Sequence, residues 1–308
     1  MKAGFLSRIF GCRANGALSD SERTLRRELL TTQDVTHTPP AFGFLRDVQL
    51  ADVCLLREIM RVSVEAGLHP WLVGGGLFGV MRHGGRFMSW DDDIDLGIIR
   101  EEYPRFLDVF NATCQKGFYA VYHYREKYCR IKVRHEELPP KVDLSVFVFD
   151  RFWKPIPTLE EKVAFRKKVD AIQCRLKKLS RTGISLEEHL RAFEEARTKE
   201  LFEGHAPASA EEKPAVFWGP ELKTFESVTS MVYDYDDIFP LRKARFEGVD
   251  VLVPNDSAAF LTYMYGDWGR FPEYFTCRHK ASNFSVEKAL ALRRFVRTHI
   301  EAEAGDEK

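Results

Sequence analysis

The stretch Trp90-Asp91-Asp92-Asp93-Ile94-Asp95-Leu96-Gly97-Ile98-Ile99 carries four carboxylates that run directly into apolar residues. Side chains alternate across a β-strand, so a strand over residues 93–99 places Asp93 and Asp95 on one side and the intervening apolar residues in the core. Two carboxylates this close repel each other unless a cation lies between them. We therefore predict that Asp93 and Asp95 bind a divalent metal, Mg²⁺ or Mn²⁺.

A second apolar run, over residues 141–146, carries a single acid, Asp143. If this run is a neighbouring strand, Asp143 is well placed to be a third metal ligand. Three carboxylates, together with phosphate oxygens and waters, can complete the coordination of two metals. That arrangement suits an in-line displacement at phosphorus, so we predict Asp93, Asp95 and Asp143 as the catalytic residues.

A solvated turn and a calcium-binding loop are the alternatives for the acidic stretch. The apolar residues that follow draw the segment into the core, where unpaired carboxylates are costly, and this argues against a solvated turn. Counting Asp91 as the first position of a calcium loop places Asp93, Asp95 and Glu102 at positions three, five and twelve. Position six, which needs glycine, is Leu96, so the calcium pattern fails.

Three consecutive glycines, Gly74, Gly75 and Gly76, follow a predicted strand at residues 70–73 and precede a predicted helical turn at residues 77–82. Backbone N–H groups in such a turn can approach a phosphate closely, and the start of a helix adds positive potential. We predict that Gly74 and Gly75 bind phosphate. The chain has neither the dinucleotide-binding nor the P-loop glycine pattern.

Basic residues flank the acids and the glycines in the sequence. Arginine binds phosphate through a bidentate fork and lysine through a point charge. We predict that Arg82 and Arg130 bind phosphate, and Lys132, two residues after Arg130, could also help to neutralise a diphosphate. Salt bridges to the acids are the alternative role for these side chains.

The apolar pattern along the chain predicts strands first and long helices later. Residues 48–66 have helical spacing, and Gly67 stands where a left-handed C-terminal cap belongs. Further helices are expected at 101–114, 159–179, 186–202, 258–265 and 286–301, strands at 118–124, 128–134 and 142–149, and a hairpin at 246–253. We predict an α+β fold in which helices flank a mixed β-sheet core and the C-terminal half is mainly helical.

We expect four regions along the chain: a flexible leader at 1–40, a catalytic core at 41–150, a mainly helical region at 151–301 that completes the same domain, and a polar tail at 302–308. Lys plus Arg and Asp plus Glu each number 46, so overall charge does not favour nucleic acid as a partner. The six cysteines form no zinc pattern and suggest a cytoplasmic protein. No stretch is apolar enough to span a bilayer. A few apolar residues among basic ones at 1–13 leave open a weak contact with the inner face of a membrane.

The residues around the glycines and acids resemble a known family. The run Leu72-Val73-Gly74-Gly75-Gly76-Leu77-Phe78-Gly79-Val80-Met81-Arg82-His83, followed by residues 90–97, is similar to the signature of the LicD family of phosphocholine and related phosphotransferases, which includes the fukutin-type enzymes. The resemblance implies a nucleotidyltransferase-like fold, and Asp93, Asp95 and Asp143 match the family's catalytic carboxylates.

The resemblance continues over most of residues 45–280. The further similar segments are Phe239-Pro240-Leu241, Phe246-Glu247-Gly248, Val253-Pro254, Tyr263-Met264-Tyr265-Gly266-Asp267-Trp268, Pro272 and Arg278-His279. This chain departs from the family at Gly76, where many members have a hydroxyl residue, and at Ser89, where many have proline. The first departure bears on how phosphate is bound.

The resemblance implies transfer of a phospho-alcohol group, such as phosphocholine, from a CDP-linked donor to a hydroxyl of a cell-surface glycan or a lipid-linked glycan precursor, releasing CMP. Two alternatives remain. The same metal site can serve a nucleotidyltransferase that delivers the nucleoside monophosphate itself. A protein of this fold can also be a catalytically silent glycan-binding protein, although the intact acids argue against that.

Overall fold

A computed structural model of the chain describes residues 19–21, 23, 24, 28, 32, 34–125, 128–202, 213–223, 231–271 and 284–301. Three of the sequence expectations lie outside the described residues. They are most of the leader before residue 34, the family-like Pro272, Arg278 and His279, and the polar tail at 302–308.

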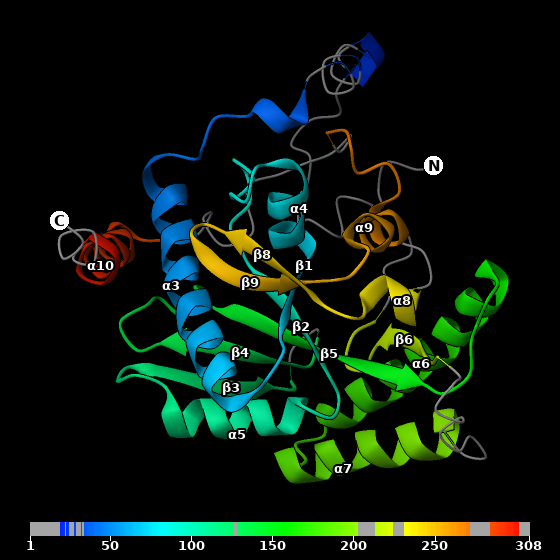
Figure 1. Ribbon diagram of the computed structural model, residues 1–308. Coiled ribbons are helices and arrows are strands. Elements are labelled where there is room, and N and C mark those ends of the chain that lie inside the picture. The colour runs from blue at the N-terminus through cyan, green and yellow to red at the C-terminus, as the bar shows by residue number, and fades with distance from the viewer. Residues whose placement is uncertain are drawn as a thin grey trace.

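The centre of the protein is a mixed β-sheet (Figure 1). Its main path runs β3-β4-β5-β2-β1-β9-β8, with β6 added beside β5 and β7 beside β6. The β2–β5 and β1–β9 pairs are parallel and the other pairs are antiparallel. The strands are β1 Trp71–Val73, β2 Asp95–Ile99, β3 Phe118–His123, β4 Arg130–His135, β5 Leu144–Phe152, β6 Ala215–Trp218, β7 Val232–Asp234, β8 Arg242–Phe246 and β9 Val249–Val253.

Helices surround this sheet and confirm the predicted α+β class. The helices are α3 Gly43–Ala66, α4 Gly74–Arg82, α5 Tyr103–Thr113, α6 Leu159–Ser180, α7 Leu186–Arg197, α8 Tyr235–Ile238, α9 Ser257–Tyr265 and α10 Val286–Val296. A short 3-10 helix, η1 Val35–His37, precedes α3, and the π-helical turns η2 Thr198–Phe202 and η4 Arg297–Glu301 extend α7 and α10. Helices predominate after residue 151, as predicted, but β6–β9 also come from this part of the chain.

Local sequence explains the helix ends. Gly67 closes α3 in the left-handed conformation, with φ 62° and ψ 45°, as the sequence predicts. Helices α6 and α7 each begin with a capping box in which a hydroxyl and a glutamate three residues later satisfy each other's backbone N–H groups, Thr158 with Glu161 and Ser185 with Glu188. These caps fix where the two charged helices start.

Two boundaries near the acids differ from the sequence expectation. Helix α4 begins at Gly74 rather than at residue 77, so the three glycines form its first turn instead of a loop before it. Gly74 has φ +55°, a conformation that lets the chain turn sharply out of β1 and that glycine adopts without penalty. Strand β2 begins at Asp95 rather than Asp93, because β1 ends at Val73, directly opposite Asp95.

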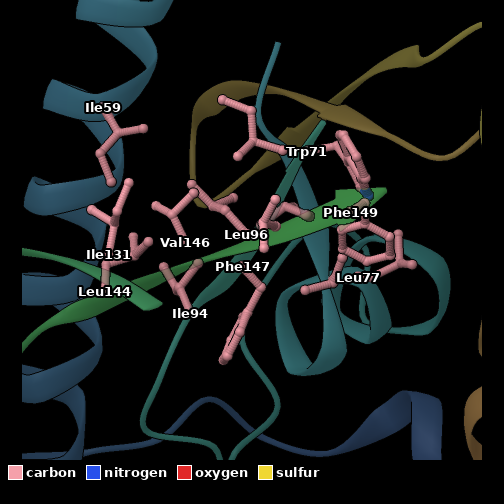
Figure 2. Packing of buried hydrophobic residues seen from close by; sticks show 14 of the residues in the cluster. Ile59, Trp71, Leu77, Ile94, Leu96, Ile131, Leu144, Val146, Phe147 and Phe149 are labelled. Atoms are coloured by element: carbon pink, nitrogen blue, oxygen red, sulfur yellow. The ribbon is translucent and has the colours of Figure 1, made fainter. Parts of the chain in front are cut away.

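Part of the core lies between the sheet and α3, which contacts β4, β5 and β9. Leu96, Val146 and Ile131 are cross-strand neighbours on β2, β5 and β4, and all three are buried. Figure 2 shows Val146 and Phe147 leaving β5 in opposite directions, as the alternation of a strand requires. Because side chains alternate, the residues next to these three on β2, β5 and β4 project from the opposite face of the sheet.

Candidate active site

The opposite face of the sheet carries a row of polar side chains. Asp95 is paired with Ser145 of β5, and Ser145 is paired with Lys132 of β4. Because directly opposite residues project to the same side of a sheet, these three side chains form one row across β2, β5 and β4. Lys132 and Ser145 are buried, and Asp95 is partly exposed.

Asp143 precedes β5 by one residue and ion-pairs with two cations of β4. Its Oδ2 atom lies 3.3 Å from Nζ of Lys132 and 3.1 Å from Nη2 of Arg134. Asp143 and Lys132 are both buried, so charge-assisted hydrogen bonds offset the cost of removing this carboxylate from water. The structure therefore places Asp143 in an ion-pair cluster at the end of the polar row.

Arg130 belongs to the same cluster of polar residues. Its Nε donates to Oγ of Ser145 at 2.9 Å, and its Nη1 donates to the carbonyl oxygen of Tyr128 at 3.2 Å. Arg130, Lys132 and Arg134 occupy alternate positions of β4, so their side chains project to one side. The predicted phosphate ligand Arg130 thus shares a sheet face with Asp95 and two further cations.

The glycines of α4 lie against the acidic stretch. A Cβ atom on Gly75 would stand 1.8 Å from Oδ2 of Asp91, so the Asp91 carboxylate occupies the space that a side chain would need. A Cβ on Gly74 would stand 3.8 Å from Oδ2 of Asp95. Two carboxylates therefore meet the N-terminal turn of α4, where the helix dipole favours negative charge.

This contact also explains the glycine at position 75 without any ligand. Gly76 has a comparable steric reason, because a Cβ there would stand 2.8 Å from Cδ2 of the buried Leu72. A side chain at position 76 would therefore point toward the core rather than toward the acids. The departure from the family at Gly76 leaves the acidic side of the helix unaltered.

Buried polar contacts hold the loop that carries Asp91. Gln49 of α3 donates through Nε2 to the carbonyl oxygens of Met88 at 3.0 Å and Asp91 at 2.8 Å. Glu247, in the β8–β9 turn, accepts a hydrogen bond from the backbone N–H of Phe87 at 2.9 Å and pairs with Arg46 at 2.8 Å. The acids are therefore positioned by α3 and by the hairpin that completes the sheet.

Arg82 is the last residue of α4, about 12 Å along the helix axis from Gly74. Its guanidinium donates to the carbonyl oxygen of Trp268 and lies 4.5 Å from the ring centre of Phe78. Burial lowers the pKa of Arg82 to about 10, and the charge of Asp91 opposes that shift. The positive charge of Arg82 therefore interacts with Asp91 in the acidic stretch. Its hydrogen bond to Trp268 holds the segment after α9.

Tyr265, at the end of α9, brings a hydroxyl to the same place. A Cβ on Gly74 would stand 3.6 Å from the Tyr265 hydroxyl oxygen. Burial raises the pKa of this phenol above its ordinary range, and the charges of Asp95, Asp91 and Asp93 raise it further. Although 43% of the residue is exposed, its hydroxyl end faces the acids, so Tyr265 remains a hydrogen-bond donor at neutral pH.

The donor set suits a hard divalent cation only in part. Asp93 and Asp95 supply the oxygen ligands that Mg²⁺ and Mn²⁺ prefer, and both are partly exposed. Within the described ranges, no group of three or more His, Cys, Asp or Glu side chains is arranged to hold a metal ion. Asp143 is paired with Lys132 and Arg134 instead, so its role as a third ligand remains a prediction.

Sequence reasoning missed several residues of this site. Arg134 and Ser145 follow the alternate-residue spacing that also selects Arg130, Lys132 and Asp143, and this spacing is a usable signal. The sequence marks Asp91 only as part of the acidic run, although it makes the closest approach to the glycines. No local pattern predicts that contact, because it joins a loop to a helix.

The region that carries these residues also matches known proteins in sequence. A family model described as the LicD/FKTN/FKRP nucleotidyltransferase domain matches residues 67–173, which include β1, the glycines of α4, Asp93, Asp95, β4 and Asp143. Residues 67–173 of this chain are similar to the LicD family. The LicD-type region therefore contains every candidate site residue predicted from the sequence, whereas Tyr265 lies beyond the matched residues.

Curated relatives match over a shorter stretch. The chain is 41% identical over 66 residues to the lipopolysaccharide cholinephosphotransferase LicD of Haemophilus influenzae, and 37% identical over 67 residues to the ribitol 5-phosphate transferase FKRP of Homo sapiens. These stretches cover 21% and 20% of this chain. They span 24% of the bacterial relative and 13% of the human one, so the likeness concerns one segment of each protein.

Proposed function

We propose that this protein is a metal-dependent phosphotransferase that moves a phospho-alcohol group from a CDP-linked donor to a hydroxyl of a glycan or lipid-linked glycan, releasing CMP. The observation that supports the proposal is that Asp95 lies beside the first turn of α4 and in one row with Ser145 and Lys132, within a region that matches the LicD-type domain. The bacterial and human relatives, a cholinephosphotransferase and a ribitol 5-phosphate transferase by name, both act on an alcohol phosphate.

In this proposal, Asp93, Asp95 and Asp143 would hold Mg²⁺ or Mn²⁺, which would supply positive charge to offset the charge of the diphosphate. Arg130 and Lys132 bind phosphate oxygens, because both project from the face of the sheet that also carries Asp95. The backbone N–H groups of Gly74 and Gly75 bind phosphate as well, at the positive N-terminal end of α4. Asp143 accepts the proton of the attacking hydroxyl. Arg82 supports the acids through Asp91.

Delivery of a nucleoside monophosphate is the second candidate, because the matching family model is described as a nucleotidyltransferase domain. The two reactions differ in the bond that breaks. Transfer of a phospho-alcohol group breaks the bond to CMP and releases CMP. Transfer of the nucleotide from CTP retains CMP on the acceptor and releases pyrophosphate.

The experiment that separates these functions is incubation of the purified protein and MgCl₂ with a panel of CDP-alcohols, including CDP-choline and CDP-ribitol, and in parallel with CTP. Acceptor glycans are added in half of the reactions, and EDTA replaces magnesium in a control. We expect CMP release that depends on acceptor and metal. Pyrophosphate from CTP without CMP from any CDP-alcohol would instead support nucleotidyl transfer.

No helix in the described ranges is long and apolar enough to cross a bilayer. CDP-linked donors are charged molecules, and we propose that the protein meets them in the cytoplasm, at the inner face of a membrane when the acceptor is lipid-linked. Fractionation of cells that produce the protein, with and without a high-salt wash, tests this placement. Release by salt would indicate a peripheral contact.

Replacing Gly75 by alanine is expected to lower the rate of CMP release about 10²-fold. The added Cβ would stand 1.8 Å from Oδ2 of Asp91, so the carboxylate must move, and a displacement of about 1 Å near a reacting centre can cost a factor of this size. Gly269→Ala is the matched control, because its Cβ would meet only Oδ1 of Asp267 at 3.6 Å. Equal rates in the two variants would show that the contact between Asp91 and α4 does not position the acids.

A further inference from the structure

The hydroxyl of Tyr265 lies beside the proposed reaction centre although its residue is far away in the sequence. Tyr265 ends α9, and α9 packs on α4 (Figure 1). The Tyr265 hydroxyl oxygen and Oδ2 of Asp95 both lie within 4 Å of the position where Gly74 would carry a Cβ. Glycine at this position thus leaves space between a phenol and a carboxylate at the start of a helix.

Aromatic packing fixes the position of the phenol ring. The Tyr265 ring centre lies 4.7 Å from that of Phe78, and Phe78 lies 6.2 Å from Trp268. The guanidinium of Arg82 covers Phe78, and Nε1 of Trp268 donates to Oγ1 of Thr262 at 3.1 Å. These contacts hold the ring between α4 and the end of α9. The hydroxyl is therefore presented in one direction.

The hydroxyl itself makes no hydrogen bond to any of the residues that the structure describes, whereas the nearby tyrosines are engaged. Tyr263 accepts a hydrogen bond from Nζ of Lys162 at 3.4 Å, and Tyr233 accepts one from Nε1 of Trp218 at 3.2 Å. A fixed phenol that faces the first turn of a helix is a donor positioned for an anionic oxygen. Asp95 and Asp91 lie near this hydroxyl, and their negative charges would repel a further carboxylate brought to it unless a cation were present.

We propose that Tyr265 is a catalytic residue that donates a hydrogen bond to a non-bridging oxygen of the transferred phosphoryl group. This inference rests on the proposed function. In the transfer step, the acceptor oxygen forms a bond to phosphorus and its proton passes to Asp143. The bond between that phosphorus and the CMP oxygen breaks, and its electron pair remains on CMP. Tyr265 keeps its proton throughout and stabilises the charge on the equatorial oxygens.

The test compares Tyr265→Phe with wild type in the CMP-release assay. Phenylalanine retains the ring that packs on Phe78, so the variant should keep the thermal stability of wild type. We expect kcat to fall about 10²-fold, the effect typical of losing one oxyanion donor, with KM for the CDP-alcohol changed less than about twofold. Tyr119→Phe is the matched control, because Tyr119 is similarly exposed, at 40%, and lies on β3 at the far edge of the sheet.

A second readout distinguishes a direct contact from a structural effect. CDP-alcohols with sulfur in place of one non-bridging oxygen on the transferred phosphorus form two diastereomers, and sulfur is a poor hydrogen-bond acceptor. Wild type should lose rate with one diastereomer, and Tyr265→Phe should show no further loss with that same one. An unchanged kcat, a rise in KM alone, or equal sulfur effects in both proteins would overturn the inference. The proposed function is tested separately: wild type should release CMP, and Asp95→Asn should not.

Discussion

Asp95→Asn is expected to lower the rate of CMP release about 10³-fold without unfolding the protein. Asparagine has the shape of aspartate but lacks the charge that a divalent cation requires. Charge stabilisation by a bound metal is worth several kcal/mol in the transition state, and about 4 kcal/mol corresponds to this factor. Because Asp95 is the first residue of β2 and is partly exposed, the neutral side chain should fit without disturbing the sheet.

Single-turnover rates with saturating donor and magnesium measure this effect. Asp108→Asn is the matched control, since Asp108 is an exposed acid on α5 and lies outside the polar row. The control should retain the wild-type rate. If Asp95→Asn retained more than a tenth of that rate, the carboxylate would not be part of the catalytic centre.

Asp150→Ala is expected to lower the free energy of unfolding by about 3–5 kcal/mol, which is the usual cost of removing one partner from a buried ion pair. Asp150 is fully buried on β5 and binds Arg100 through two hydrogen bonds of 2.9 and 2.8 Å. Glu221 pairs with the same arginine at 2.6 Å, and Arg197 lies 3.4 Å from Asp150. Without Asp150, Arg100 is left with Glu221 and Arg197 is left with Glu194.

The charge state of Arg100 shows how strongly the cluster is coupled. Burial alone would lower the pKa of Arg100, but Asp150 and Glu221 reverse that effect and raise the pKa well above its ordinary range. Arg100 directly follows β2, so this ion-pair cluster anchors the end of β2 opposite to Asp95. Loss of Asp150 should therefore weaken the sheet that carries Asp95, the proposed catalytic acid.

Urea denaturation followed by circular dichroism measures the stability change, with Asp108→Ala as the exposed control. The m-value should stay the same, so that the shift in midpoint reports stability alone. A loss below about 1 kcal/mol, the range of exposed ion pairs, would mean that the cluster is not a buried anchor.

Residue periodicity predicted the local parts of this fold correctly. The alternation of acidic and apolar residues at 93–99 located β2, and the spacing at 48–66 with Gly67 located the C-terminal part of α3. The hairpin around Gly248 was also predicted. Each of these features depends on contacts within one segment, which a sequence pattern can express.

Pairings between distant segments were not predictable in the same way. The ion pairs of Asp143 depend on the register of β4 against β5, which places Lys132 opposite Ser145. The approach of Tyr265 to Gly74 depends on the packing of α9 against α4, which brings together residues from the two halves of the chain. The sequence named Tyr265 only through its resemblance to a family segment, with no indication of what its hydroxyl faces.

Direct measurement of metal binding tests the central claim, that Asp93 and Asp95 hold a divalent cation. Electron paramagnetic resonance can follow the binding of Mn²⁺ to wild type, to Asp93→Asn/Asp95→Asn and to the control Asp108→Asn, in the presence and absence of CDP-choline. We predict binding by wild type and the control, tighter with the nucleotide present, and at least tenfold weaker binding by the double variant. Equal Mn²⁺ affinity in all three proteins would contradict the assignment of this site.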